Sequence, residues 1–244
     1  MLLRCIRAEN RKLRGCAIWP VFLIVPMISA GYGTFNYLQN LGLLQSEWYS
    51  LFTQHTLFYS MFFFAPLVGI YAAYLWRLEH TGHNWNRIMA APVPPILLYL
   101  AKLAVVLKLA LLTQLWVCVL YVACGKLWAG LPGFPPLEIL LWIMRGALGS
   151  VAIIALQLLL SMVIRSFAVP VLIALAGGVA GMMAVNWDLG LFWPYALMLL
   201  GMNSNKSEDA LAGGIAGFLL STAVFTALFV AVAWILLKKR DVKA

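Results

Sequence analysis

The sequence predicts an all-α polytopic membrane protein with six transmembrane helices in one domain, residues 1–244. Of its 244 residues, 64% are hydrophobic and only 10% are charged, whereas a soluble domain carries about 25% charged residues. The mean hydropathy is +0.93. A helix needs about 20 apolar residues to cross the hydrocarbon core of a bilayer. The chain contains six apolar segments that meet this requirement.

Residues 1–14 predict a helix that lies at the membrane interface. Its arginines are three or four residues apart, so they line one side of a helix; they are Arg4, Arg7, Arg11 and Arg14. Apolar residues between them supply surface for the headgroup boundary. The alternative is a cleaved signal peptide, because a basic segment precedes an apolar run. The length of the basic segment and the poor cleavage signal favour the interfacial helix.

The predicted spans follow in order, at 16–35, 57–76, 96–122, 139–164, 168–187 and 211–237. Pro20 and Pro26 predict a kink in the first span, because proline leaves a carbonyl that neighbouring groups must satisfy. The polar and aromatic stretch 36–56 is expected to be a loop. The apolar piece 191–202 is too short to cross and contains Pro194, so we expect a re-entrant or interfacial hairpin.

Two basic residues lie inside apolar segments. Lys102 is near the start of the third span, from which a lysine can reach the interface through its flexible stem. Arg145 lies inside the fourth span, where an unpaired charge is costly. Either that helix begins later and leaves 137–145 at the interface, or Arg145 faces protein or water. We favour the later start.

The charge distribution predicts that both termini are cytoplasmic. The net charge of +9 comes from residues beside the spans, where they orient the protein and contact anionic lipid rather than nucleic acid. Most of the 17 Lys and Arg fall on one side: Arg4, Arg7, Arg11, Lys12, Arg14, Arg77, Arg87, Lys102, Lys108, Arg165, Lys238, Lys239, Arg240 and Lys243. Only Lys126, Arg145 and Lys206 fall on the other.

The polar stretch 77–92 on this basic side has the pattern of a short amphipathic helix ended by Pro92. Trp85 would lie on its apolar side. Its other side would face water or a protein partner and consists of Glu79, His83, Asn86 and Arg87.

Two GxxxG pairs, Gly177 with Gly181 and Gly213 with Gly217, are typical of helices whose backbones approach closely. They would pack helices within one chain or across a dimer.

The sequence lacks the motifs of an enzyme or a nucleotide-binding protein. There is no GxxxxGK[ST] loop to hold phosphates. His80 and His83 supply two metal ligands without an obvious third, so neither a metal site nor a catalytic residue is predicted. Acidic residues fall in loops, span ends or tails, which disfavours an ion-driven carrier. The energy for transport would then come from another subunit.

Glu79-His80, Asn84-Trp85, Pro92 and Lys102, after two spans and before four more, resemble the permease subunits of lantibiotic-immunity ABC transporters. These are ABC-2 type exporters. The resemblance covers most of the chain, although Pro94-Pro95 departs from the basic residue that family members often carry there. It implies the ABC-2 type (type V) permease fold, with an interfacial helix, a cytoplasmic coupling helix and a short re-entrant piece.

The resemblance also implies partners and a role. Two permeases, identical or paralogous, would join two copies of a separate ABC ATPase, which binds ATP and Mg, while this chain binds no cofactor. The family expels peptide antibiotics from the bacterial cytoplasmic membrane. Residues expected to couple to the ATPase are Glu79, His80, Asn84, Trp85 and Arg87.

Possible peptide contacts on the outward side are Glu47, Trp48, Asp188 and Trp193, although aromatic residues there also anchor spans at the interface. Three alternatives stay open. One is an exporter of a lipid, polysaccharide or drug on the same architecture. Another is an integral-membrane enzyme with His80 or His83 as its base. The third is a membrane sensor.

Overall fold

The computed structural model describes residues 1–81, 84–85, 92–204, 206 and 208–239, and this part of the chain is helical and without strands. The elements are α1 (Leu2–Lys12), α2 (Ile18–Gln39), α3 (Glu47–Phe58), the π-helix η1 (Tyr59–Phe64), α4 (Ala65–His80), α6 (Pro95–Leu127), α7 (Leu137–Val163), α8 (Ala168–Asn186), the 3₁₀-helix η2 (Gly190–Phe192), α9 (Ala196–Gly201) and α10 (Gly214–Lys239). Six helical stretches in this part are long and apolar enough to cross a membrane. The predicted all-α fold with six spans is confirmed.

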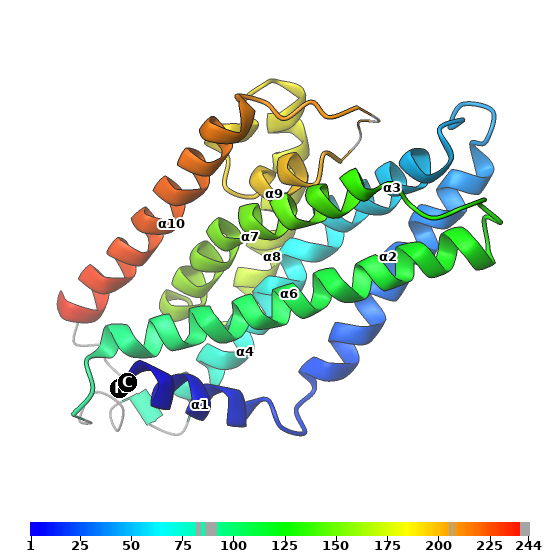
Figure 1. Cartoon of the computed structure of the whole chain (residues 1–244). Helices are drawn as coiled ribbons and strands as arrows, with labels where there is room; N and C mark the ends of the chain where they lie inside the picture. The colour runs from blue at the N-terminus through cyan, green and yellow to red at the C-terminus, as the bar shows by residue number, and fades with distance from the viewer. Residues whose placement is uncertain (82–83, 86–91, 205, 207, 240–244) are drawn as a thin grey trace.

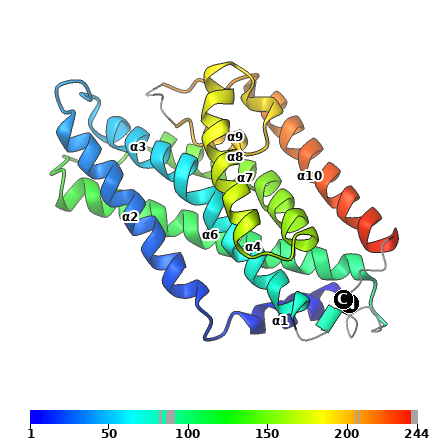
Figure 2. The same cartoon turned by 180° about the vertical axis from the view of Figure 1, so that it is seen from behind.

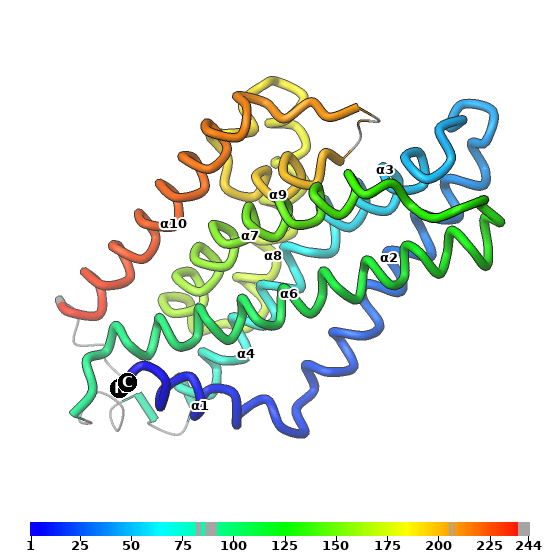
Figure 3. The backbone as a smooth tube through the Cα atoms, viewed as in Figure 1, coloured from blue at the N-terminus to red at the C-terminus, as the bar shows by residue number. Residues whose placement is uncertain are grey.

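The spans form a bundle with α7 near its centre (Figure 1), where it packs against α4, α6, α9 and α10. Seen from behind, α2 and α10 lie at opposite sides of the bundle (Figure 2). The 33-residue α6 slants across the whole bundle (Figure 3). Its length of about 50 Å exceeds the hydrocarbon thickness of about 30 Å. The short α1 packs against α6 at the end of the bundle where α4 and α10 finish.

The expected loop at 36–56 is largely helical. α2 continues to Gln39 and a new helix begins at Glu47, which runs without a break through η1 and α4 to His80. The polar residues that suggested a loop are paired inside the bundle, since the Thr34 hydroxyl lies 2.8 Å from His55 Nε2. The first four residues of the polar stretch 77–92 therefore belong to the crossing helix.

Arg145 corrects a second expectation, because α7 begins at Leu137 and the later start that we favoured is wrong. Its guanidinium donates two hydrogen bonds of 2.9 Å to the Asp209 carboxylate and one of 3.3 Å to the Gly201 carbonyl. The charge is tolerated inside the helix because it faces the protein and is paired.

The segment between α8 and α10 folds back into the bundle, and all of α9 is buried. Small residues allow this approach. A Cβ on Gly149 of α7 would lie 2.5 Å from the Leu197 carbonyl oxygen, and one on Gly181 would lie 3.2 Å from the Ala196 nitrogen. Gly177 faces the Tyr195 ring in the same way. The first GxxxG pair therefore packs within the chain.

The second GxxxG pair, Gly213 and Gly217, does not lie on one helix face as expected, because only Gly217 belongs to α10. Gly213 precedes α10 and has φ of +69°, a conformation that favours glycine. It faces Leu191, and so does Gly217 in the first turn of α10. This pair also lies against a residue of the same chain.

Candidate functional site

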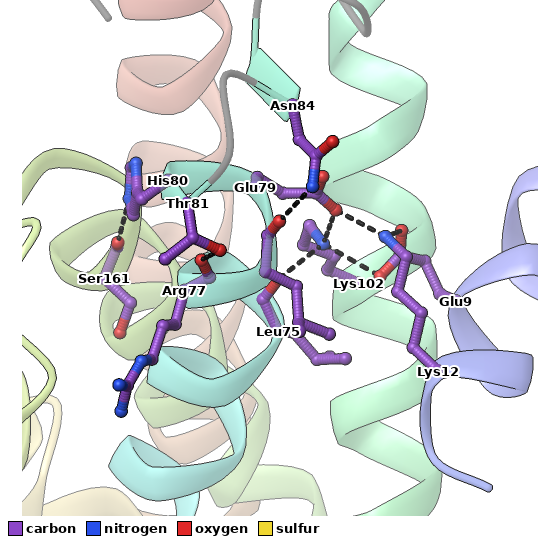
Figure 4. A network of polar contacts seen from close by, with 11 residues as sticks. Glu9, Lys12, Leu75, Arg77, Glu79, His80, Thr81, Asn84, Lys102 and Ser161 are labelled. Carbon is purple, nitrogen blue, oxygen red and sulfur yellow. Dashed lines mark hydrogen bonds and ion pairs between the residues drawn. The ribbon is translucent and has the colours of Figure 1, made fainter.

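Four charged side chains meet where α1, α4 and α6 come together (Figure 4). Lys102 of α6 is completely buried, and its Nζ lies 2.8 Å from Glu9 Oε2, 2.8 Å from Glu79 Oε1 and 3.0 Å from the Leu75 carbonyl. Lys12 closes the cluster, 2.5 Å from Glu9 and hydrogen-bonded to Glu79. We call Glu9, Lys12, Glu79 and Lys102 the ion network.

The ion network is neutral and its central donor is satisfied. An ammonium group has three donors, and Lys102 has three acceptors in place. Burying an unpaired charge costs several kcal/mol, so each member depends on the others. Burial lowers the pKa of Lys12. The Glu9 and Glu79 carboxylates raise it by more than burial lowers it, so the pKa lies above its usual value.

Two expectations are corrected by this geometry. Lys102 does not extend to the interface, and Glu79 does not face water, because its residue is only 3% exposed. Glu9, which the sequence analysis did not single out, supplies the reason. It is the only acidic residue before Glu47, a signal that marks it as a partner for a buried cation.

Three aromatic rings, Trp76, His80 and Trp85, form a stack that adjoins the ion network through Trp76. The ring centroids of the stack lie 5.6 to 6.2 Å apart, and Lys102 Nζ lies 5.0 Å from the Trp76 ring centroid, within cation–π range. His80 Nε2 lies 3.1 Å from the Ser161 carbonyl of α7. The stack therefore ties the end of α4 to α7.

The remaining coupling candidates lie around this core. Asn84 donates to the Leu78 carbonyl at 2.9 Å and is half-buried. Trp85 is only 4% exposed. Arg87, like His83 and Asn86, lies outside the described residues. Near the end of α4, the exposed side chains among described residues are Arg77 and Thr81.

The three arginines of α1 and Arg14 just after it are all exposed, while Glu9 of α1 and Leu13 at its C-terminal cap are buried. One side of α1 thus enters the bundle through the ion network, and the exposed side carries arginines together with the apolar side chains of Leu2 and Leu3. This arrangement is what an interfacial helix requires.

The predicted peptide contacts belong to the start of α3 and to the segment after α8, which lie at the end of the bundle opposite α1 (Figures 1 and 2). Glu47 and Asp188 are exposed. Trp48 is buried, because its Nε1 donates to the Pro132 carbonyl at 2.7 Å and its ring packs edge-on against Tyr121. Trp193 is partly exposed and donates to the Gly177 carbonyl.

Trp193 also lines a surface hollow of about 320 Å³ at the end of α8, which we call the apolar hollow. Its other lining residues are Ala180, Met183, Ala184, Trp187, Leu189 and Phe192. Two of them, Trp187 and Phe192, are largely exposed. In the part of the chain that is described, no three His, Cys, Asp or Glu side chains gather in a way that would hold a metal ion.

Comparison with protein families gives a match to the family described as ABC-2 family transporter protein, over residues 5–181. The matched region runs from α1 through most of α8 and includes the complete ion network. A comparison with curated proteins gave no match. Permeases of this family are membrane transport subunits and work with an ABC ATPase. The chain therefore belongs to the ABC-2 family of transporter proteins, as a multi-pass permease.

Proposed function

We propose that this permease expels peptide antibiotics of the lantibiotic type from the bacterial cytoplasmic membrane, driven by a separate ABC ATPase docked at the basic end of the bundle. The observation that carries the proposal is the ion network. It joins α1, α4 and α6 beside the exposed residues Arg77 and Thr81.

The ion network makes the end of α4 a rigid element on which the ATPase can act. A push on the end of α4 moves α1 and α6 as well, because separating them would expose or unpair buried charges. α4 also belongs to the continuous 34-residue helix Glu47–His80. Motion at its basic end therefore reaches Trp48 at the far end, where α3 contacts Tyr121 of α6. Closure of two ATPase copies on ATP and Mg would supply that push.

The far end has the chemistry of a site for a cationic, amphipathic peptide. Asp188 is exposed and directly follows Trp187 of the apolar hollow. Aromatic side chains bind apolar surface well, and an exposed carboxylate attracts a cation. With both termini cytoplasmic, this end faces outward and release there is export. The second permease of the complex would be an identical or a paralogous chain.

An exporter of a lipid or an apolar drug is the second candidate. The apolar hollow favours it, because a site lined by Met183, Trp187, Phe192 and other apolar side chains suits an acyl chain as well as the apolar face of a peptide. The two candidates differ in whether the cargo must carry positive charge.

The test is co-purification of the tagged full chain from its native membrane in mild detergent, followed by ATPase assays on the complex in lipid discs. An ABC ATPase is expected in stoichiometric amount, with hydrolysis stimulated by a cationic lantibiotic. A neutral apolar peptide of the same length serves as the control. Stimulation by lipid or apolar drug alone would favour the second candidate. Absence of any ATPase partner would refute both.

A further inference from the structure

The side of α1 that faces away from the bundle carries a second hollow, of about 310 Å³. It is lined by Arg7, Asn10, Arg11 and Arg14. We call it the basic hollow. It lies on the opposite side of α1 from the ion network, since Glu9 is buried in the bundle while Arg7, Arg11 and Arg14 are exposed. The fourth arginine, Arg4, does not line it.

The positive charge in the basic hollow is not neutralised within the described part of the chain. None of its three guanidinium groups has a hydrogen bond or an ion pair with a described residue. The nearest carboxylate in sequence, Glu9, is already paired with Lys12 and Lys102. The hollow therefore offers an anion three guanidinium groups that are not paired with any described residue.

The hollow is also held in place. Asn10 donates to the Ile6 carbonyl at 2.9 Å, and its Oδ1 accepts a hydrogen bond from Lys108 Nζ of α6. Lys108 adds a fourth cation beside the hollow. Because Asn10 is fixed between two helices, the arginines on either side of it share one concave surface rather than a loose face.

We propose that the basic hollow binds the phosphate of an anionic phospholipid headgroup. Guanidinium forks match phosphate oxygens in geometry and charge. The hollow lies on a helix that leads directly into the first span and at the end of the bundle richest in Lys and Arg, where phospholipid headgroups are the abundant phosphates. A lipid in the hollow fixes α1 from outside, while the ion network fixes it from inside.

This inference goes beyond the proposed export of peptides and does not depend on the cargo. The experiment uses the full chain in detergent, titrated with phosphatidylglycerol or with zwitterionic phosphatidylcholine, and counts bound lipid by native mass spectrometry. The variants are Arg11→Gln and the double variant Arg7→Gln/Arg11→Gln. Arg4→Gln is the matched control, because it removes the same charge from the same helix outside the hollow.

The chain should retain phosphatidylglycerol in preference to phosphatidylcholine. Arg11→Gln should weaken that retention about five-fold and the double variant about 25-fold, while Arg4→Gln changes it by less than about two-fold. The substituted side chains are exposed, so melting temperatures without lipid should match the wild type and separate lost binding from lost folding.

Three results would overturn the proposal. Equal weakening by Arg4→Gln and Arg11→Gln would indicate diffuse attraction to the whole helix. Equal retention of the two lipids would exclude recognition of the headgroup charge. Displacement of phosphatidylglycerol by an equal concentration of inorganic phosphate would assign the hollow to a free ion rather than to a lipid.

Discussion

The two ends of the bundle are held together by opposite means. At the basic end, α1, α4 and α6 are joined by the four ion pairs of the ion network, together with the hydrogen bond from Lys102 to the Leu75 carbonyl. At the far end, α9 is held against α7 by contacts to glycine, since Gly149 faces the Leu197 carbonyl and Gly201 faces the Arg145 carbonyl.

The difference follows from what each junction must join. In a membrane, small residues let helix backbones pack closely without a hydrophobic driving force, and this is how the short, buried α9 lies against α7. A surface helix such as α1 cannot enter the bundle in that way, because its own polar side chains must be satisfied. Charge pairing is directional and breaks as a unit when one partner is lost, whereas a close contact fails only through steric overlap. The basic end should therefore be the more sensitive to single substitutions.

The largest effect is expected for Lys102→Met. The substitution keeps an unbranched side chain only one atom shorter but leaves Glu9 and Glu79 buried with only Lys12 to pair with, at a cost of about 3–5 kcal/mol. The melting temperature of the full chain in detergent, followed by tryptophan fluorescence, should fall strongly.

The matched control is Lys108→Met, which removes the same group from an exposed position about 1.7 turns along α6. Among the described residues it loses only an exposed hydrogen bond to Asn10, and it should change stability little. Equal losses in the two variants would show that the ion network adds no stability of its own.

A smaller loss is expected for Gly149→Ala. The added methyl group would lie 2.5 Å from the Leu197 carbonyl oxygen, a backbone atom that cannot rotate away. Overpacking of this kind costs about 1–3 kcal/mol. Gly31→Ala in α2 meets nothing within 4 Å, so its melting temperature should equal or exceed that of the wild type. An unchanged melting temperature in Gly149→Ala would contradict the packing of α9 described above.

The Arg145–Asp209 pair at the far end should contribute less. Its geometry is bidentate, but the Asp209 side chain is 51% exposed, and solvent screens such pairs to about 1 kcal/mol or less. A double-mutant cycle with Arg145→Gln and Asp209→Asn measures the interaction. A coupling free energy as large as the loss for Lys102→Met would reverse the proposed ranking of the two ends.

The smallest effect concerns pH. The pKa of Lys12 is raised above 10.5 in the folded chain. Its contribution to the free energy of unfolding is therefore complete below pH 10.5 and is lost only as the pH rises through the higher folded pKa. The Arg145 hydrogen bonds lower the pKa of Asp209 below 3.8, so its contribution is lost only as the pH falls through the lower folded pKa. Neither group should titrate between about pH 5 and 9. A slope in the melting temperature over that range that Lys12→Gln removes would contradict the Lys12 assignment.

The spans could be predicted because hydropathy and length depend on local sequence alone. The same holds for 191–202, whose shortness and Pro194 exclude a crossing helix. The prediction of a loop at 36–56 was wrong because His55 and Gln54 are polar, and a polar residue indicates a loop until its partner is known. Their partners, Thr34 and Asn36, lie on α2, across the turn to α3.

The candidate site was only partly predictable for the same reason. The stretch 77–92 was selected by its polarity, yet Glu79 within it is buried. Its environment is set by Lys102 and by Glu9, 93 residues before Lys102, and no local pattern links these positions. An unpaired lysine inside a span is costly, and considered together with the single acid of the first 46 residues it would have suggested the pair.

The central claim, that an ABC ATPase docks at the end of α4 beside the ion network, is tested most directly by photo-crosslinking in native membranes. A photoreactive phenylalanine analogue is placed at the exposed Thr81 and, as a control, at the exposed Leu43. Leu43 belongs to the turn between α2 and α3, which lies at the opposite end of the bundle (Figure 1). The account predicts a crosslink to the ATPase from Thr81 and none from Leu43. No crosslink from Thr81, or equal crosslinks from both positions, would contradict it.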